Sequence, residues 1–140
     1  MIDFNLLNVT SPAINEEKIT RWINNVASTF GKRVGNITYI FTDDENILKV
    51  NQEFLNHDYY TDIITFDYSK RGLISGDLYI SLETVKTNAE QLDNEYDTEL
   101  LRVIIHGVLH LCGINDKGPG EREIMEQHEN AALSLYLSMD

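Results

Sequence analysis

Residues 100–112 read LLRVIIHGVLHLC, and this stretch decides the fold. Apolar side chains would stand on almost every side of a helix with this sequence. A helix that is apolar all round passes through a protein core, whereas a surface helix carries a single apolar stripe. We therefore expect the other elements of the chain to pack around residues 100–112.

The segments on both sides of this stretch alternate between strand and helix patterns. Apolar residues at three-and-four spacing predict helices, the first starting near Ser11-Pro12. Runs of β-branched and aromatic residues predict strands, two of them joined as a hairpin by turn residues 69–72. The acidic residues 93–99 are interpreted as a solvated connector and first helical turn. The expected strands are residues 2–7, 37–42, 61–68 and 74–81; the expected helices fall within residues 11–30, 43–55, 82–92, 100–112 and 121–139.

Four strands and about five helices predict an α+β (mixed α/β) fold built on one four-stranded sheet. A chain of 140 residues has room for one domain with a real core. No repeat and no Ser/Gly/Pro linker divides the sequence. We therefore expect residues 1–140 to form a single domain.

Charge and composition exclude several classes of function. The chain holds 11 Lys and Arg against 23 Asp and Glu, a net charge of −12, which opposes a broad, sequence-blind grip on nucleic acid. Two basic pairs, Lys32-Arg33 and Lys70-Arg71, fall in predicted turns and are interpreted as solvated residues. No long apolar run and no signal peptide is present, so we expect a cytoplasmic protein; the single cysteine, Cys112, agrees with this.

A metal-ligand pattern occupies the end of the central helix. His106 and His110 are four residues apart, so both rings lie on one helix face and can aim at one point. Gly113 can take the left-handed conformation that ends a helix, which lets the chain fold back and return Asp116 to the same point. Two imidazoles and one carboxylate leave a fourth position for water, as in a catalytic zinc site. Cys112 should point elsewhere, as a buried, inert thiol.

The spacing from His106 to Asp116 overlays the metzincin protease pattern, but Gly107 stands where those enzymes carry the glutamate base. A zinc metalloprotease-like hydrolase is therefore the second interpretation. The bare ligand set also fits a non-haem iron protein. His57 and His128 receive no role.

The motif His106-Gly-x-Leu-His-Leu-x-Gly, with Glu121, Met125 and Glu129 downstream, resembles the signature of the YbeY family. Two further blocks agree with that family: residues 51–66, which contain Thr61-Asp62-Ile-Ile-Thr-Phe66, and residues 76–80, which begin Gly76-Asp77. The resemblance covers residues 37–130 and implies a zincin-like metal-binding helix.

The resemblance implies a zinc-dependent, single-strand-specific endoribonuclease, also called an rRNA maturation factor, with one Zn²⁺ per chain. Its implied role is 16S rRNA 3′-end maturation and ribosome quality control in the cytoplasm. The implied partners are single-stranded RNA or rRNA and the small ribosomal subunit or a ribosomal protein, with no membrane and no DNA. A non-catalytic ribosome-assembly protein with a structural zinc is a further alternative.

Two positions depart from the family pattern. Asp116 stands where the family most often has a histidine ligand, and zinc accepts a carboxylate oxygen there. Leu55 stands where the family has an arginine thought to face the substrate phosphate. Lys117, beside the predicted ligand Asp116, is our first candidate to contact that phosphate instead. The catalytic base is left unassigned.

Overall fold

A computed structural model describes residues 1–55 and 61–140 of the chain. It contains a mixed sheet of four strands in the order β1-β2-β4-β3. β1 and β4 both run parallel to β2, whereas β3 runs antiparallel to β4 at the sheet edge. The strands are β1 (Ile2–Leu6), β2 (Arg33–Thr42), β3 (Ile63–Asp67) and β4 (Leu73–Ser81). The helical elements are α1 (Glu16–Thr29), α2 (Asp44–Val50), the short π-helix η1 (Asn51–Leu55), α3 (Leu82–Gln91), α4 (Tyr96–Leu111) and α5 (Glu121–Ser138).

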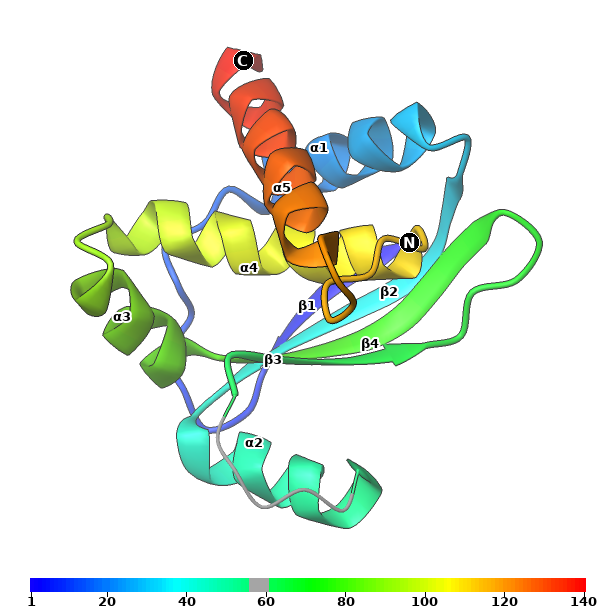
Figure 1. The fold of residues 1–140 in the computed structure, drawn as a ribbon. Helices are drawn as coiled ribbons and strands as arrows, with labels where there is room; N and C mark the ends of the chain where they lie inside the picture. Colours follow the sequence, from blue (N-terminus) through cyan, green and yellow to red (C-terminus); the bar gives the residue numbers. More distant parts are fainter. Residues whose placement is uncertain (56–60) are drawn as a thin grey trace.

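Helix α4 lies between the sheet and the outer helices α1 and α5, while α2 lies beyond the opposite side of the sheet (Figure 1). Most of α4 is buried, as the sequence predicts for residues 100–112. Two buried side chains join elements of the core: Tyr39 of β2 donates to the carbonyl of Ile104 in α4 at 2.9 Å, and Trp22 of α1 donates to that of Ala132 in α5 at 2.7 Å. The predicted fold class is confirmed.

Several element boundaries differ from the prediction. Helix α1 begins at Glu16, not near Ser11-Pro12, because the side chain of Asn15 accepts a hydrogen bond from the Lys18 amide at 3.0 Å and caps the helix. Strand β2 begins at Arg33, ahead of the predicted residue 37, and an irregularity in its pairing with β4 lies between Val34 and Ile37.

Helix α4 begins at Tyr96, so the end of the acidic stretch 93–99 forms its first turn, as expected from the sequence. Glu99 is only 5% exposed, and its interpretation as a solvated residue is therefore wrong. Within the described residues, no helix is long and apolar enough to cross a membrane.

Candidate metal centre

Helix α4 and the turn that follows it bring the three predicted ligands together. Gly113 adopts φ +98°, its amide donates to the carbonyl of His110 at 2.9 Å, and the Ile114 amide donates to that of Leu109 at 3.0 Å. These two bonds form the left-handed cap that satisfies the last carbonyls of a helix. The chain then turns back, and Asp116 faces the two histidine rings.

The three facing atoms have the spacing of ligands around one metal ion. The Nε2 atoms of His106 and His110 lie 3.0 Å apart, and Oδ2 of Asp116 lies 3.2 Å from the first and 3.4 Å from the second. Tetrahedral zinc with bonds of about 2.0–2.1 Å places its ligand atoms about 3.3 Å from one another. The three side chains therefore fit three corners of a tetrahedral site.

Glu129 of α5 orients the first of these rings. Its Oε2 lies 2.6 Å from Nδ1 of His106, and its Oε1 accepts from Nη1 of Arg102 at 2.9 Å. A carboxylate can only accept, so the proton of this bond sits on Nδ1, and Nε2 is the atom turned toward Asp116. Metal-binding histidines usually carry such a partner on the second nitrogen.

This environment makes His106 more basic than His110. Burial disfavours the charged form of His106, but the hydrogen bond and charge of Glu129, together with the charges of Asp116 and Asp62, outweigh burial and raise the pKa of the ring. Burial and the neighbouring charge of His106 lower the pKa of His110. Burial also opposes ionisation of Glu129, yet the hydrogen bonds from His106 and Arg102 lower its pKa overall.

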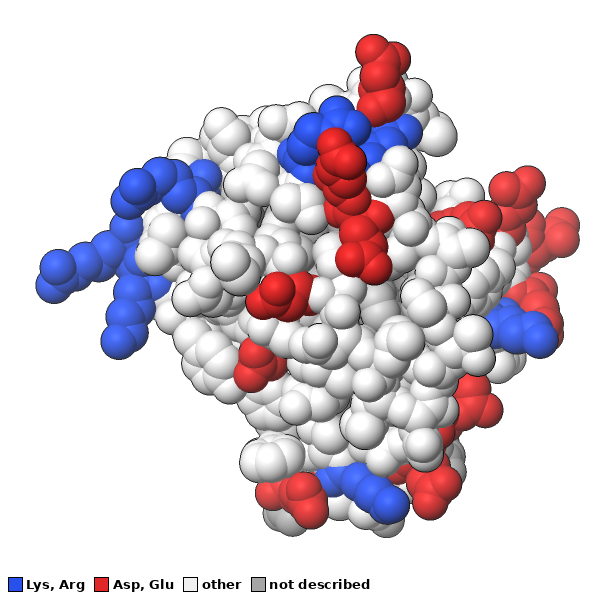
Figure 2. Space-filling view, turned by 180° about the vertical axis from the view of Figure 1, so that it is seen from behind, with Lys and Arg blue, Asp and Glu red and all other residues white. Residues whose placement is uncertain are grey.

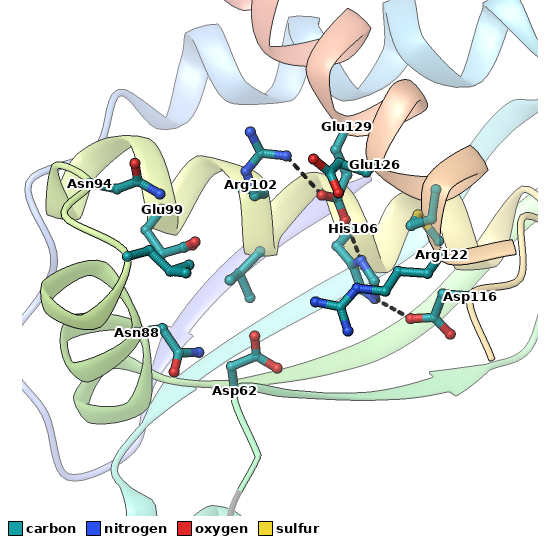
Figure 3. Close-up of a pocket in the computed structure, with 13 residues that line it drawn as sticks. Asp62, Asn88, Asn94, Glu99, Arg102, His106, Asp116, Arg122, Glu126 and Glu129 are labelled. Atoms are coloured by element: carbon teal, nitrogen blue, oxygen red, sulfur yellow. Dashed lines mark hydrogen bonds and ion pairs between the residues drawn. The ribbon is translucent and has the colours of Figure 1, made fainter. Parts of the chain in front are cut away.

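The triad of His106, His110 and Asp116 borders two cavities. The first, of about 570 Å³, lies among α3, α4 and α5 and is called here the helical cavity (Figure 3). The second, of about 490 Å³, runs along β3 and the turn after α4 and is called the β3 cavity. Asp62, His106 and Asp116 line both cavities. The triad therefore lies where the two cavities meet.

Charged side chains that the sequence interpretation did not assign also line the helical cavity. Asp62 points toward His106 in Figure 3, and Arg122 extends from α5 into the same space. Burial raises the pKa of Asp62 and of Glu99. Glu129 belongs to the sequence motif that begins at His106, and it lies in α5 on the buried stripe with Met125 and Ala132, but neither signal predicts its bond to His106.

The sequence analysis also named residues outside the triad, and the structure shows where most of them lie. Lys117 and Leu55 line the same β3 cavity. Cys112 is buried, and burial raises the pKa of its thiol to about 11, in agreement with an inert side chain. The ring of His128 contacts that of Phe30 at a centroid distance of 5.2 Å. His57 lies outside the described residues.

Position 107 faces the sheet, away from the triad. A Cβ on Gly107 would lie 2.9 Å from Cδ1 of Ile63 and 3.1 Å from Cδ2 of Leu78. A glutamate at this position would be directed into packed side chains, so the chain has no place here for the base that zinc proteases use.

Comparison with known proteins identifies the family. The family model for endoribonuclease YbeY matches residues 6–136. This chain belongs to the YbeY family.

YbeY proteins of several bacteria match most of the chain. The endoribonuclease YbeY of Phocaeicola vulgatus is 62% identical over 135 residues, which cover 96% of this chain and 98% of the relative. That of Bacteroides thetaiotaomicron is 64% identical over 127 residues, covering 91% and 93%. The solution structure of a Thermotoga maritima protein shares the fold, with a TM-score of 0.68 and 24% identity over 99% of this chain and 93% of that one. The resemblance to YbeY drawn from the sequence motifs is confirmed.

Proposed function

We propose that this chain is a zinc-dependent endoribonuclease that cuts single-stranded RNA. Membership of the endoribonuclease YbeY family makes it an RNA-cleaving hydrolase. The observation that supports metal dependence is the triad itself, in which two imidazole nitrogens and one carboxylate oxygen lie 3.0–3.4 Å apart at the meeting point of two cavities.

His106, His110 and Asp116 would hold the metal. Two nitrogens and one oxygen suit zinc, and three protein ligands leave a corner for water, as in catalytic sites. When bound there, zinc polarises a phosphoryl oxygen and lowers the pKa of a water molecule. The carboxylate of Asp116 gives the site one negative charge more than a third histidine would.

Asp62 is our candidate for the proton acceptor. It lines both cavities, and its carboxylate points toward His106 (Figure 3). A base at this place can take a proton from the attacking hydroxyl group, either of water or of the ribose. Burial raises the pKa of Asp62, which increases its strength as a base.

Lys117 and Arg122 would contact phosphates on the two sides of the triad. Lys117 lines the β3 cavity together with Leu55, so it can serve the region that the family arginine serves. Arg122 lines the helical cavity and makes no ion pair with another described residue. A strand crossing the triad would then meet one cation on each side.

The cellular role proposed for this activity rests on the family resemblance. It is 16S rRNA 3′-end maturation and ribosome quality control in the cytoplasm, with the small ribosomal subunit or a ribosomal protein as partner. We propose no membrane or DNA partner.

The test combines metal analysis with cleavage of a labelled single-stranded RNA. Protein purified without added metal should contain one zinc per chain, and His110→Ala should lose both the zinc and the cleavage. His128→Ala, a histidine outside the triad, should keep both. A content of iron instead of zinc would overturn the zinc assignment, and full cleavage by metal-free His110→Ala would overturn metal dependence.

The same preparations test the alternatives. Hydrolysis of peptides in place of RNA would support the protease interpretation. A conservative His110→Gln variant that still folds, as judged by urea unfolding, guards against loss of activity through misfolding. If this variant lacks zinc but supports ribosome assembly fully, the zinc is structural.

A further inference from the structure

Four basic side chains lie together at one end of the sheet. The Arg33 amide donates to the carbonyl of Gly72 at 2.8 Å, and Arg33 pairs with Leu73 in the register of β2 and β4. The start of β2 therefore lies against the hairpin between β3 and β4. We call Lys32, Arg33, Lys70 and Arg71 the basic patch. Figure 2 shows a group of Lys and Arg side chains projecting at the hairpin end of the molecule.

The charges of the basic patch are not neutralised by neighbouring acids. None of its four residues forms an ion pair with any residue in the described part of the chain. They are a large share of the 11 Lys and Arg in a chain of net charge −12. Such a local cluster on an acidic protein is suited to binding a polyanion. Binding is favourable because Lys and Arg side chains that contact phosphates release the counterions condensed on them.

The β3 cavity leads from the triad toward this patch. Its lining follows β3 from Thr61 to Asp67, where the hairpin that carries Lys70 begins. From Ile63 to Asp67 the strand extends about 13 Å at 3.3 Å per residue, which a stacked nucleic-acid strand covers in about four nucleotides.

We propose that the basic patch binds the phosphate backbone of the substrate RNA about four nucleotides from the cut. The strand runs from the triad along β3 to the hairpin. This inference rests on the proposed endoribonuclease function, since it assigns the path of the substrate of that same site. It also explains how a strongly acidic chain holds RNA, since a few local cations at the hairpin contact the strand.

The direct test is a double charge reversal, Arg33→Glu with Lys70→Glu. Both side chains are exposed, and one comes from each segment of the patch. The matched control is Lys49→Glu with Lys86→Glu, which changes the net charge equally at exposed positions on α2 and α3. Binding of a fluorescent 12-nucleotide single-stranded RNA is measured with chelator present, so that no cutting occurs, over a range of salt concentrations.

The patch variant should bind the RNA about tenfold or more weakly than the control. The slope of log K, where K is the association constant, against log salt should become less steep by about 1.4, which corresponds to two lost phosphate contacts on a single strand. Equal affinities and slopes for the two variants would overturn the proposal. Equal weakening of binding to polyglutamate and RNA would also overturn it, because the patch would then be a site for acidic polypeptides.

Substrate length separates this proposal from the proposed function. With metal present, the patch variant should cleave a trinucleotide as fast as the unmodified protein but lose efficiency on the 12-nucleotide RNA. Equal efficiency on both lengths would refute the strand path while leaving the endoribonuclease function in place. Absence of any metal-dependent cleavage by the unmodified protein would refute the function itself.

Discussion

Replacing Glu129 by Gln should weaken metal binding, lower the stability of the fold, or do both, although Glu129 is not itself a proposed ligand. Its carboxylate accepts two hydrogen bonds, one from Nδ1 of His106 at 2.6 Å and one from Arg102 at 2.9 Å. A glutamine has one oxygen and one NH₂ group, and the NH₂ group cannot accept. One of the two donors therefore loses its partner in Glu129→Gln.

The two possible orientations of the amide have different costs. If its NH₂ group faces His106, Nδ1 must become the acceptor, the ring proton moves to Nε2, and the lone pair needed for the metal is lost. If the NH₂ group faces Arg102, two donors oppose each other, which costs about 1–3 kcal/mol of stability. Loss of a partner of this kind typically lowers metal affinity about 10- to 100-fold, or about 1.4–2.7 kcal/mol.

The assay is a zinc titration against a chromophoric chelator at fixed pH and salt, paired with urea unfolding in excess EDTA. Glu123→Gln is the matched control, because Glu123 is exposed on the same helix. The expected result is lower zinc affinity, lower stability, or both for Glu129→Gln alone. Unchanged zinc affinity together with unchanged stability would show that the bond between His106 and Glu129 does not orient the ring.

Three further predictions concern stability and catalysis. Burial raises the pKa of Glu99, so the folded protein binds the carboxyl proton more tightly than the unfolded chain, and this stabilising effect of the proton is lost as pH rises through the folded pKa. Glu99→Gln should therefore raise Tm at pH 7, and this gain in Tm should vanish below about pH 4. A gain in Tm that calorimetry finds constant across that pH range would contradict this. A Cβ on Gly76 would lie 2.5 Å from the backbone oxygen of Phe66. Gly76→Ala should therefore lower the free energy of unfolding, measured with urea, by about 1–3 kcal/mol. Gly107→Ala should lose less unfolding free energy than Gly76→Ala, because the new methyl group meets only side-chain methyl groups and alanine regains about 1 kcal/mol of helix propensity. A larger loss for Gly107→Ala than for Gly76→Ala would refute the packing argument. Asp62→Asn should lower kcat on RNA by about 10²–10⁴-fold with zinc content unchanged, and a normal kcat would remove Asp62 as the base.

The proposed metal ligands could be located from the sequence because their geometry is local. Helix periodicity alone places His106 and His110 on one face, and Gly113 marks the helix end that returns Asp116. These residues lie within one short stretch, so no knowledge of the tertiary structure is needed to bring them together.

The rest of the site depends on packing between distant segments. Glu129 reaches His106 because α5 crosses α4. Asp62 lines the same cavities as His106 because it directly precedes β3, the edge strand of the sheet. Neither approach follows from spacing along the chain. The basic pairs likewise come together through the parallel register of β2 and β4, in which Arg33 pairs with Leu73. Ser11 is a plausible cap by residue type, but the side chain of Asn15 is the one that reaches a helix amide.

The position of the triad between two cavities also affects the release of the cleaved RNA. An intact strand would be held on both sides of the triad, so its two contacts reinforce each other. After cleavage, each fragment keeps only the contacts of one cavity and departs independently of the other. Product inhibition should therefore slow turnover only slightly, and short fragments added in excess should compete poorly with uncut RNA.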